Sequence, residues 1–66
     1  MINTNKLKGL ITEKGYSQKS IAKAIGIVPK TFYVKMKRGV FGSDEIEKMI
    51  FLLDIDDPAS IFFAKE

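Results

Sequence analysis

The sequence of 66 residues contains no cysteine, no histidine and no tryptophan. The absence of cysteine excludes disulfide bonds, thiolate nucleophiles and thiolate zinc sites. The absence of histidine removes the side chain that most often carries out acid–base catalysis near neutral pH. We therefore expect no resident metal ion, no cofactor and no enzymatic activity.

Long hydrophobic runs are also absent. No apolar run approaches the roughly 18 residues that a transmembrane helix requires, and residues 1–8 lack the apolar centre of a signal peptide. We therefore expect a cytoplasmic protein that does not associate with membranes. Apolar residues still make up 45% of the chain, which is enough for a core, and the length predicts a single domain over residues 1–66.

Acidic residues are missing from the middle of the chain. Residues 17–40 contain five lysines and one arginine without an acid, whereas residues 41–66 contain seven acids and two lysines. The two segments therefore carry net charges of +6 and −5 within a total of +3. A basic segment of this kind can be a solvated surface, or it can bind phosphates if its charges converge on one side.

The pattern of apolar residues predicts an all-α fold of five short helices, because apolar residues recur three and four positions apart and no segment alternates with period two. Each helix begins at a polar cap or a proline, and the first three end at a glycine. The first three predicted helices cover residues 4–14 after a cap at Asn3 or Thr4, residues 18–25 after the cap Ser17, and residues 29–38 from Pro29. The fourth follows the cap Ser43 and is predicted to bury Ile46, Met49, Ile50 and Leu53. The last begins at the cap Asp57 and Pro58 and continues through Ile61, Phe62 and Phe63.

Residues 17–39 predict a helix-turn-helix unit. Two helices of about eight and ten residues are separated only by Gly26, Ile27 and Val28. Gly26 suits the positive φ that such a turn requires, and Ala22 is small where the helices must approach closely.

The third helix is predicted to have an outer face that suits the major groove of DNA. Lys30 can reach guanine O6 and N7, Val34 can touch a thymine methyl group, and Tyr33 can donate to a phosphate or a base edge. Lys37 and Arg38 suit backbone phosphates. Gln18 and Lys19 open the second helix, whose N-terminus can also meet a phosphate.

The segment SQKSIAKAIGI at 17–27, followed by KTF at 30–32 and KRG at 37–39, resembles the lambda-repressor-like helix-turn-helix family. More narrowly, the chain is similar to the small Cro- and repressor-type regulators of temperate phages. The resemblance covers nearly the whole chain, including the first helix and the acidic fourth helix.

The resemblance implies an all-α, lambda-repressor-like DNA-binding domain in which helices 2 and 3 form the helix-turn-helix. Such proteins bind double-stranded operator DNA, usually as a homodimer, and act as transcriptional regulators, here as a Cro-like repressor. Gln18 would contact a phosphate, and Val28, Pro29, Lys30, Tyr33 and Val34 would read bases. The chain departs from the family pattern at Val28, where a capping serine or threonine is usual, and at Pro29, where glutamine or arginine often reads a base.

Two other functions fit the same residues. A helix-turn-helix domain can instead dock on another repressor protein as an antirepressor or modulator. An enzyme would depend on a carboxylate pair such as Asp54 with Asp56 or Asp57, but these residues are better placed to cap the last helix.

The last helix is the predicted dimer surface. Ile61, Phe62 and Phe63 are candidates for the interface, although they could instead complete the core. Because neighbouring residues on a helix point about 100° apart, we expect one phenylalanine to face the core and the other to face outward.

Overall fold

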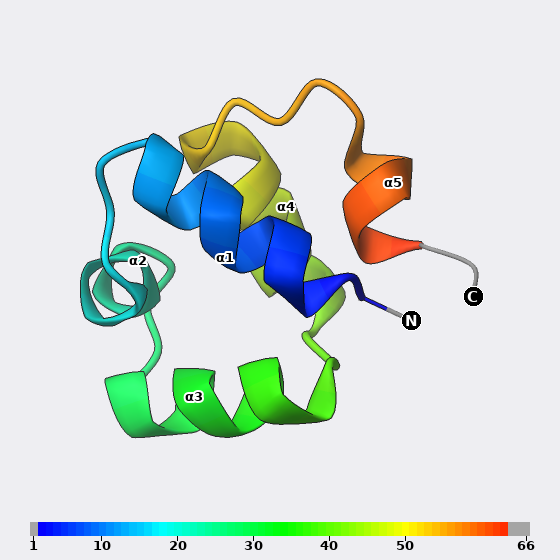
Figure 1. The fold of residues 1–66 in the computed structure, drawn as a ribbon. Coiled ribbons are helices and arrows are strands. Elements are labelled where there is room, and N and C mark those ends of the chain that lie inside the picture. The colour runs from blue at the N-terminus through cyan, green and yellow to red at the C-terminus, as the bar shows by residue number, and fades with distance from the viewer. Residues whose placement is uncertain (1, 64–66) are drawn as a thin grey trace.

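The computed structural model describes residues 2–63. Within this range the chain forms five helices and no strand, so the prediction of an all-α fold with five short helices is confirmed (Figure 1). The helices are α1 (Thr4–Glu13), α2 (Gln18–Ala24), α3 (Pro29–Arg38), α4 (Ser43–Leu52) and α5 (Pro58–Phe62).

The helix ends follow the predicted capping residues, with one correction. The side chain of Asn3 accepts a hydrogen bond from the Lys6 amide at 3.1 Å and caps α1. Ser17 and Ser20 form a reciprocal capping box at the start of α2. The prediction that Ser43 caps the fourth helix is wrong. Gly42 is the cap residue, and Glu45 closes the helix start by accepting the Gly42 amide hydrogen at 2.8 Å.

Two of the glycines that end helices in the left-handed conformation, as predicted, border α3. Gly26 has φ +85° after α2, and Gly39 has φ +71° after α3. A side chain at either position would be strained there, because L-residues rarely adopt positive φ. These glycines let the chain turn at once and keep the connections on both sides of α3 short.

One core of apolar side chains joins all five helices. Four residues that were predicted to be buried in the core are only half-buried at its edge: Leu10, Ile27, Ile46 and Ile50. The rings of Phe32 and Phe41 meet at 5.2 Å between centroids and attach the loop after α3 to the core. The core consists of Ile2, Leu7, Ile11, Ile21, Ala22, Ile25, Phe32, Met36, Phe41, Met49, Leu53, Ile61 and Phe62.

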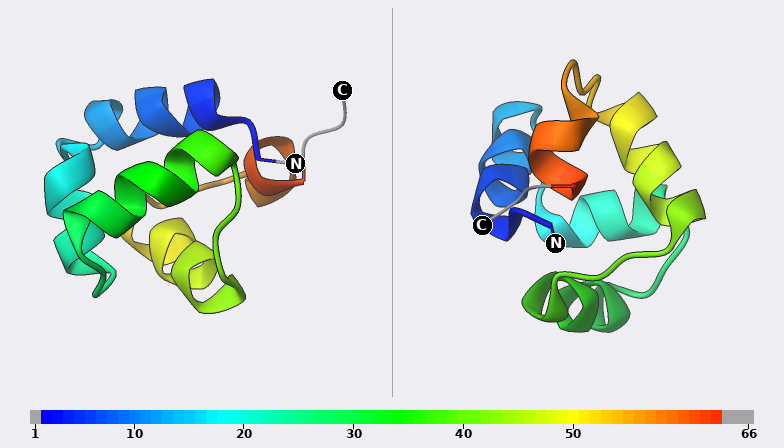
Figure 2. Two further views of the ribbon diagram at one scale, coloured as in Figure 1. Left: turned by 90° about the horizontal axis from the view of Figure 1, so that it is seen from below. Right: turned by 90° about the vertical axis from the view of Figure 1, so that its right-hand side faces the viewer.

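The arrangement in space leaves α3 along one side of the molecule. Helix α1 packs against α2 and α5, and α2 packs most closely on α3. The two ends of the described chain meet where the Asn3 amide donates to the Ile61 carbonyl at 2.7 Å. In the right-hand view of Figure 2, α3 lies at the lower margin of the molecule, and in the left-hand view, from below, it faces the viewer with no other helix in front of it.

Candidate nucleic-acid interface

The turn between α2 and α3 is held by backbone hydrogen bonds. The Gly26 amide donates to the Lys23 carbonyl at 3.1 Å, and the Ile27 amide donates to the Ala22 carbonyl at 3.0 Å. The side chain of Ala22 is completely buried beneath this turn. A larger residue at this position would separate the two helices, so the small side chain fixes how closely they approach.

Helix α3 has an inner and an outer face. Phe32 and Met36 are buried, as predicted, and anchor the helix on the core. The opposite face is exposed, and Tyr33 and Val34 each leave about half of the side chain in solvent (48% and 49%). The outer face of α3, as we name it, consists of Lys30, Tyr33, Val34 and Lys37.

The start of α3 differs from a typical capped helix. Val28 is the cap residue, its side chain makes no capping hydrogen bond, and it is 64% exposed. Pro29 occupies the first helical position, where its missing N–H costs no hydrogen bond, and its side chain is half-buried. The two predicted base-reading residues before Lys30 therefore offer an aliphatic surface rather than hydrogen-bonding groups.

The predicted phosphate-binding residues lie in two places. Lys37 and Arg38 are exposed in the last turn of α3. Gln18, half-buried, and Lys19, exposed, open α2 at the end remote from the turn. The structure gathers the α3 residues on one helix, whereas Gln18 and Lys19 stand apart from them along the chain.

One cation of the basic segment is not available to a phosphate. The ammonium group of Lys35 lies 2.6 Å from a carboxylate oxygen of Glu45 in a partly buried ion pair. Burial alone would raise the pKa of Glu45, but hydrogen bonds from Lys35 and the Gly42 amide, with the charges of Lys35 and Lys48, lower it below its ordinary value. Lys35 belongs to the basic segment by sequence, and its pairing with a residue ten positions away leaves no local signal in that sequence.

A second contact ties α4 to the turn. The Lys48 ammonium group donates to the carbonyl of Ile25, the residue that ends α2, at 3.4 Å. Glu45 and Lys48 therefore fasten α4 to α3 and to the end of α2. This arrangement holds the outer face of α3 in one orientation relative to the core.

The three residues predicted for the dimer interface, at the end of the chain, differ in how far they are exposed to solvent. Ile61 and Phe62 are buried, which agrees with the alternative that they complete the core rather than form a surface contact. Phe63, which follows α5, is 69% exposed. The expectation that one phenylalanine faces the core and the other faces outward is confirmed.

The carboxylates considered for catalysis lie at a shallow hollow beside α5. Asp54, Asp56 and Asp57 line it together with Lys6 and Lys14. Asp57 is the cap residue of α5, as predicted, but its side chain makes no capping hydrogen bond. Within residues 2–63 no group of three or more acidic residues is arranged to hold a metal ion.

Over the described part of the chain, none of the helices has the length and apolar character needed to cross a membrane.

Comparison of the sequence with known proteins finds no relative. No protein-family model matches the chain, and no curated protein matches it either.

Proposed function

We propose that the chain is a sequence-specific transcriptional regulator that binds double-stranded DNA in the cytoplasm. Helices α2 and α3 act as a helix-turn-helix, and α3 enters the major groove of an operator. The single observation that carries this proposal is the outer face of α3, where exposed cations alternate with a phenol and an aliphatic group. A merely solvated helix has little use for an exposed valine there, whereas a thymine methyl group is a natural contact for it.

Charge supports the same function. Within α3 the cations Lys30, Lys37 and Arg38 are exposed, and residues 17–40 contain no acid that would repel a phosphate. The resemblance to Cro- and repressor-type regulators of temperate phages points to a repressor that binds as a homodimer. A dimer doubles the few contacts that one small domain can make with a half-site.

The test is DNA binding by the purified chain over a range of salt concentrations, followed by selection of a preferred site from random duplexes. A dimer that neutralises roughly eight phosphates should give a log–log slope near −7, at about −0.9 per phosphate. A flat salt response, or no binding at low salt, contradicts the proposal.

One observation favours a second candidate function, a module that binds another repressor protein. Tyr33 and Val34 expose apolar surface on the outer face of α3, Val28 exposes apolar surface at the start of the same helix, and Pro29 removes one hydrogen-bonding position. A protein-binding module should bind DNA weakly by itself and strongly only in the presence of its partner, and the same titration distinguishes the two functions.

A further inference from the structure

The most exposed large apolar side chain in residues 2–63 is Phe51, on the last turn of α4, at 84%. A single exposed apolar residue needs no explanation, but a ring that stands beside an apolar hollow is typical of an interaction surface. Phe51 has such a hollow next to it.

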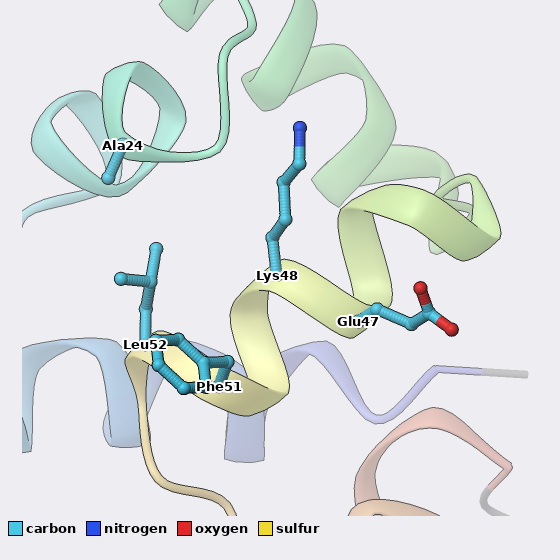
Figure 3. A pocket seen from close by; sticks show the side chains of 5 residues that line it. All are labelled: Ala24, Glu47, Lys48, Phe51 and Leu52. Carbon is cyan, nitrogen blue, oxygen red and sulfur yellow. The ribbon is translucent and has the colours of Figure 1, made fainter.

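The hollow is a shallow groove of about 410 Å³ between α4 and the end of α2. Leu52 extends from α4 toward α2, where Ala24 lies across the groove (Figure 3). Glu47 and Lys48 are the charged residues that line it. We call this surface the α4 patch; it consists of Ala24, Glu47, Lys48, Phe51 and Leu52.

The α4 patch carries the features that a two-fold interface requires of one surface. In a two-fold dimer each copy presents the same patch, so a projecting group and its receptor must both belong to it. Here Phe51 projects and the groove of Ala24 and Leu52 lies beside it. Glu47 and Lys48 are opposite charges on neighbouring residues, so a two-fold arrangement can pair each with the other residue in the second copy.

We propose that the α4 patch is the surface through which two copies of this chain associate. Phe51 of each copy enters the groove of the other. Lys48 can take part while it donates to Ile25, because an ammonium group has three donors. This inference rests on the proposed function to the extent that an operator-binding protein of this size requires a dimer.

Charge excludes nucleic acid as the occupant of the α4 patch. Residues 41–63 carry six acids and one lysine, a net charge of −5, which repels a phosphate backbone. A second copy carries the same net charge, but at the patch itself its Glu47 and Lys48 can each pair with the opposite charge of the first copy. Phe51 and Leu52 lie on the last turn of α4, at the opposite end of that helix from the loop that follows α3 (Figure 3), so we expect pairing through them to leave the outer face of α3 free in both copies.

Sedimentation of the full chain and two matched variants tests the inference. Phe51→Ser and Phe63→Ser each remove one exposed phenylalanine and leave the core intact. We expect the parent and Phe63→Ser to sediment as dimers, and Phe51→Ser to raise the dimer dissociation constant roughly thirtyfold or more, as for an interface hot spot. A dimer of unchanged affinity in Phe51→Ser overturns the inference, as does a parent that is monomeric at every concentration.

Charge exchange gives a second measurement that does not depend on Phe51. Glu47→Lys and Lys48→Glu each place like charges opposite one another and should weaken the dimer. The double variant Glu47→Lys with Lys48→Glu restores unlike pairs and should recover at least part of the affinity. Equal weakening in the double variant and the single variants overturns the pairing.

Failure of the inference can be separated from failure of the proposed function. A monomeric Phe51→Ser variant keeps the outer face of α3, so it should still bind nonspecific duplex with a salt dependence, of roughly half the slope of the dimer. If the parent dimerises through Phe51 but neither protein binds duplex at low salt, the α4 patch stands and the DNA-binding function falls.

Discussion

Residues 17–40 and residues 41–63 each contribute two helices to the same core, yet they present opposite charges to the solvent. The first segment carries +6 and exposes aliphatic and phenolic side chains along α3. The second carries −5 and exposes two phenylalanines, Phe51 and Phe63. Both segments therefore combine exposed apolar groups with charge of one sign, and only the first is suited to a polyanion.

The two segments are joined by one ion pair and one hydrogen bond. Lys35 of the basic segment binds Glu45 of the acidic one, and Lys48 of the acidic segment donates to the carbonyl that ends α2. The comparison indicates that α4 supports α3 through its inner contacts and leaves its outer residues available for a different partner.

The largest effect is expected in the acidic segment at Phe62, the buried phenylalanine of α5. Phe62→Ala should lower the free energy of unfolding by about 3–5 kcal/mol, because the ring is almost fully buried and its loss leaves a cavity. A domain of this size is stable by only about 3–10 kcal/mol, so the variant can unfold at room temperature. Urea unfolding followed by circular dichroism measures the loss.

The neighbouring residue provides the control. Phe63→Ala should change stability by less than about 0.5 kcal/mol, because that ring is mostly in solvent. Equal losses in the two variants would show that both rings are buried in solution.

The basic segment should respond in DNA binding rather than in stability. Lys30→Ala should cost about 1–3 kcal/mol at the selected site and less on other sequences, if Lys30 reads a guanine. Lys37→Ala should weaken binding to all duplexes alike, because phosphates carry no sequence. Titration of both variants against a selected and an unrelated duplex decides the roles, and equal losses for Lys30→Ala on both would reduce it to a phosphate contact.

The sequence was sufficient for the parts of this comparison that depend on local chemistry. Gly26 and Gly39 end their helices, Pro29 opens α3, and the periodic spacing of Phe32 and Met36 places them inside. These are properties of a few consecutive residues. Once Phe32 and Met36 are placed inside, the helical period puts the residues of the outer face of α3 on the opposite side of the helix.

Contacts between residues far apart in the chain could not be predicted from the sequence. The Lys35–Glu45 pair joins two helices across a loop whose path depends on Phe41 meeting Phe32. Phe51 lies off the buried stripe of Ile46, Met49, Ile50 and Leu53, so periodicity agrees with its exposure, but the groove beside it depends on how α2 packs next to α4. For the same reason the exposed member of the pair Phe62 and Phe63 needed the position of α5 against α1.

A smaller effect is expected at the ion pair that joins the two segments. Glu45→Gln should lower stability by about 1 kcal/mol near neutral pH, because solvent around Lys35 screens part of the interaction. The folded pKa of Glu45 is lowered, so the stabilisation is complete above the unfolded pKa and is lost as the pH falls through the folded pKa. Glu45→Gln should therefore flatten the acid limb of stability against pH.

A neighbouring acid distinguishes the ion pair from charge in general. Asp44→Asn removes an exposed carboxylate from the same turn of α4. It should leave most of the acid limb in place. If Asp44→Asn flattened the acid limb as much as Glu45→Gln, the dependence on pH would belong to the acidic segment as a whole.

The smallest effect concerns the uncapped start of α3, where stability and DNA reading should oppose one another. Val28 has the extended backbone of a cap residue, with φ −68° and ψ 136°, but no side-chain oxygen to accept the free amide hydrogens of the first turn. Val28→Ser supplies that oxygen and should stabilise the fold by up to about 1 kcal/mol, since an exposed valine loses little packing. The same change removes an aliphatic surface from the predicted base-reading side, so affinity for the selected duplex should fall while the melting temperature rises. Val40→Ser is the matched control, because Val40 is similarly exposed (62%) but lies in the loop after α3, where its backbone amide donates to the Lys35 carbonyl and its side chain is not at a helix start. A melting temperature that is unchanged in Val28→Ser would mean that the serine hydroxyl prefers water to the α3 amides, and a rise in both variants would mean that removing an exposed valine, rather than adding a cap, stabilises the chain.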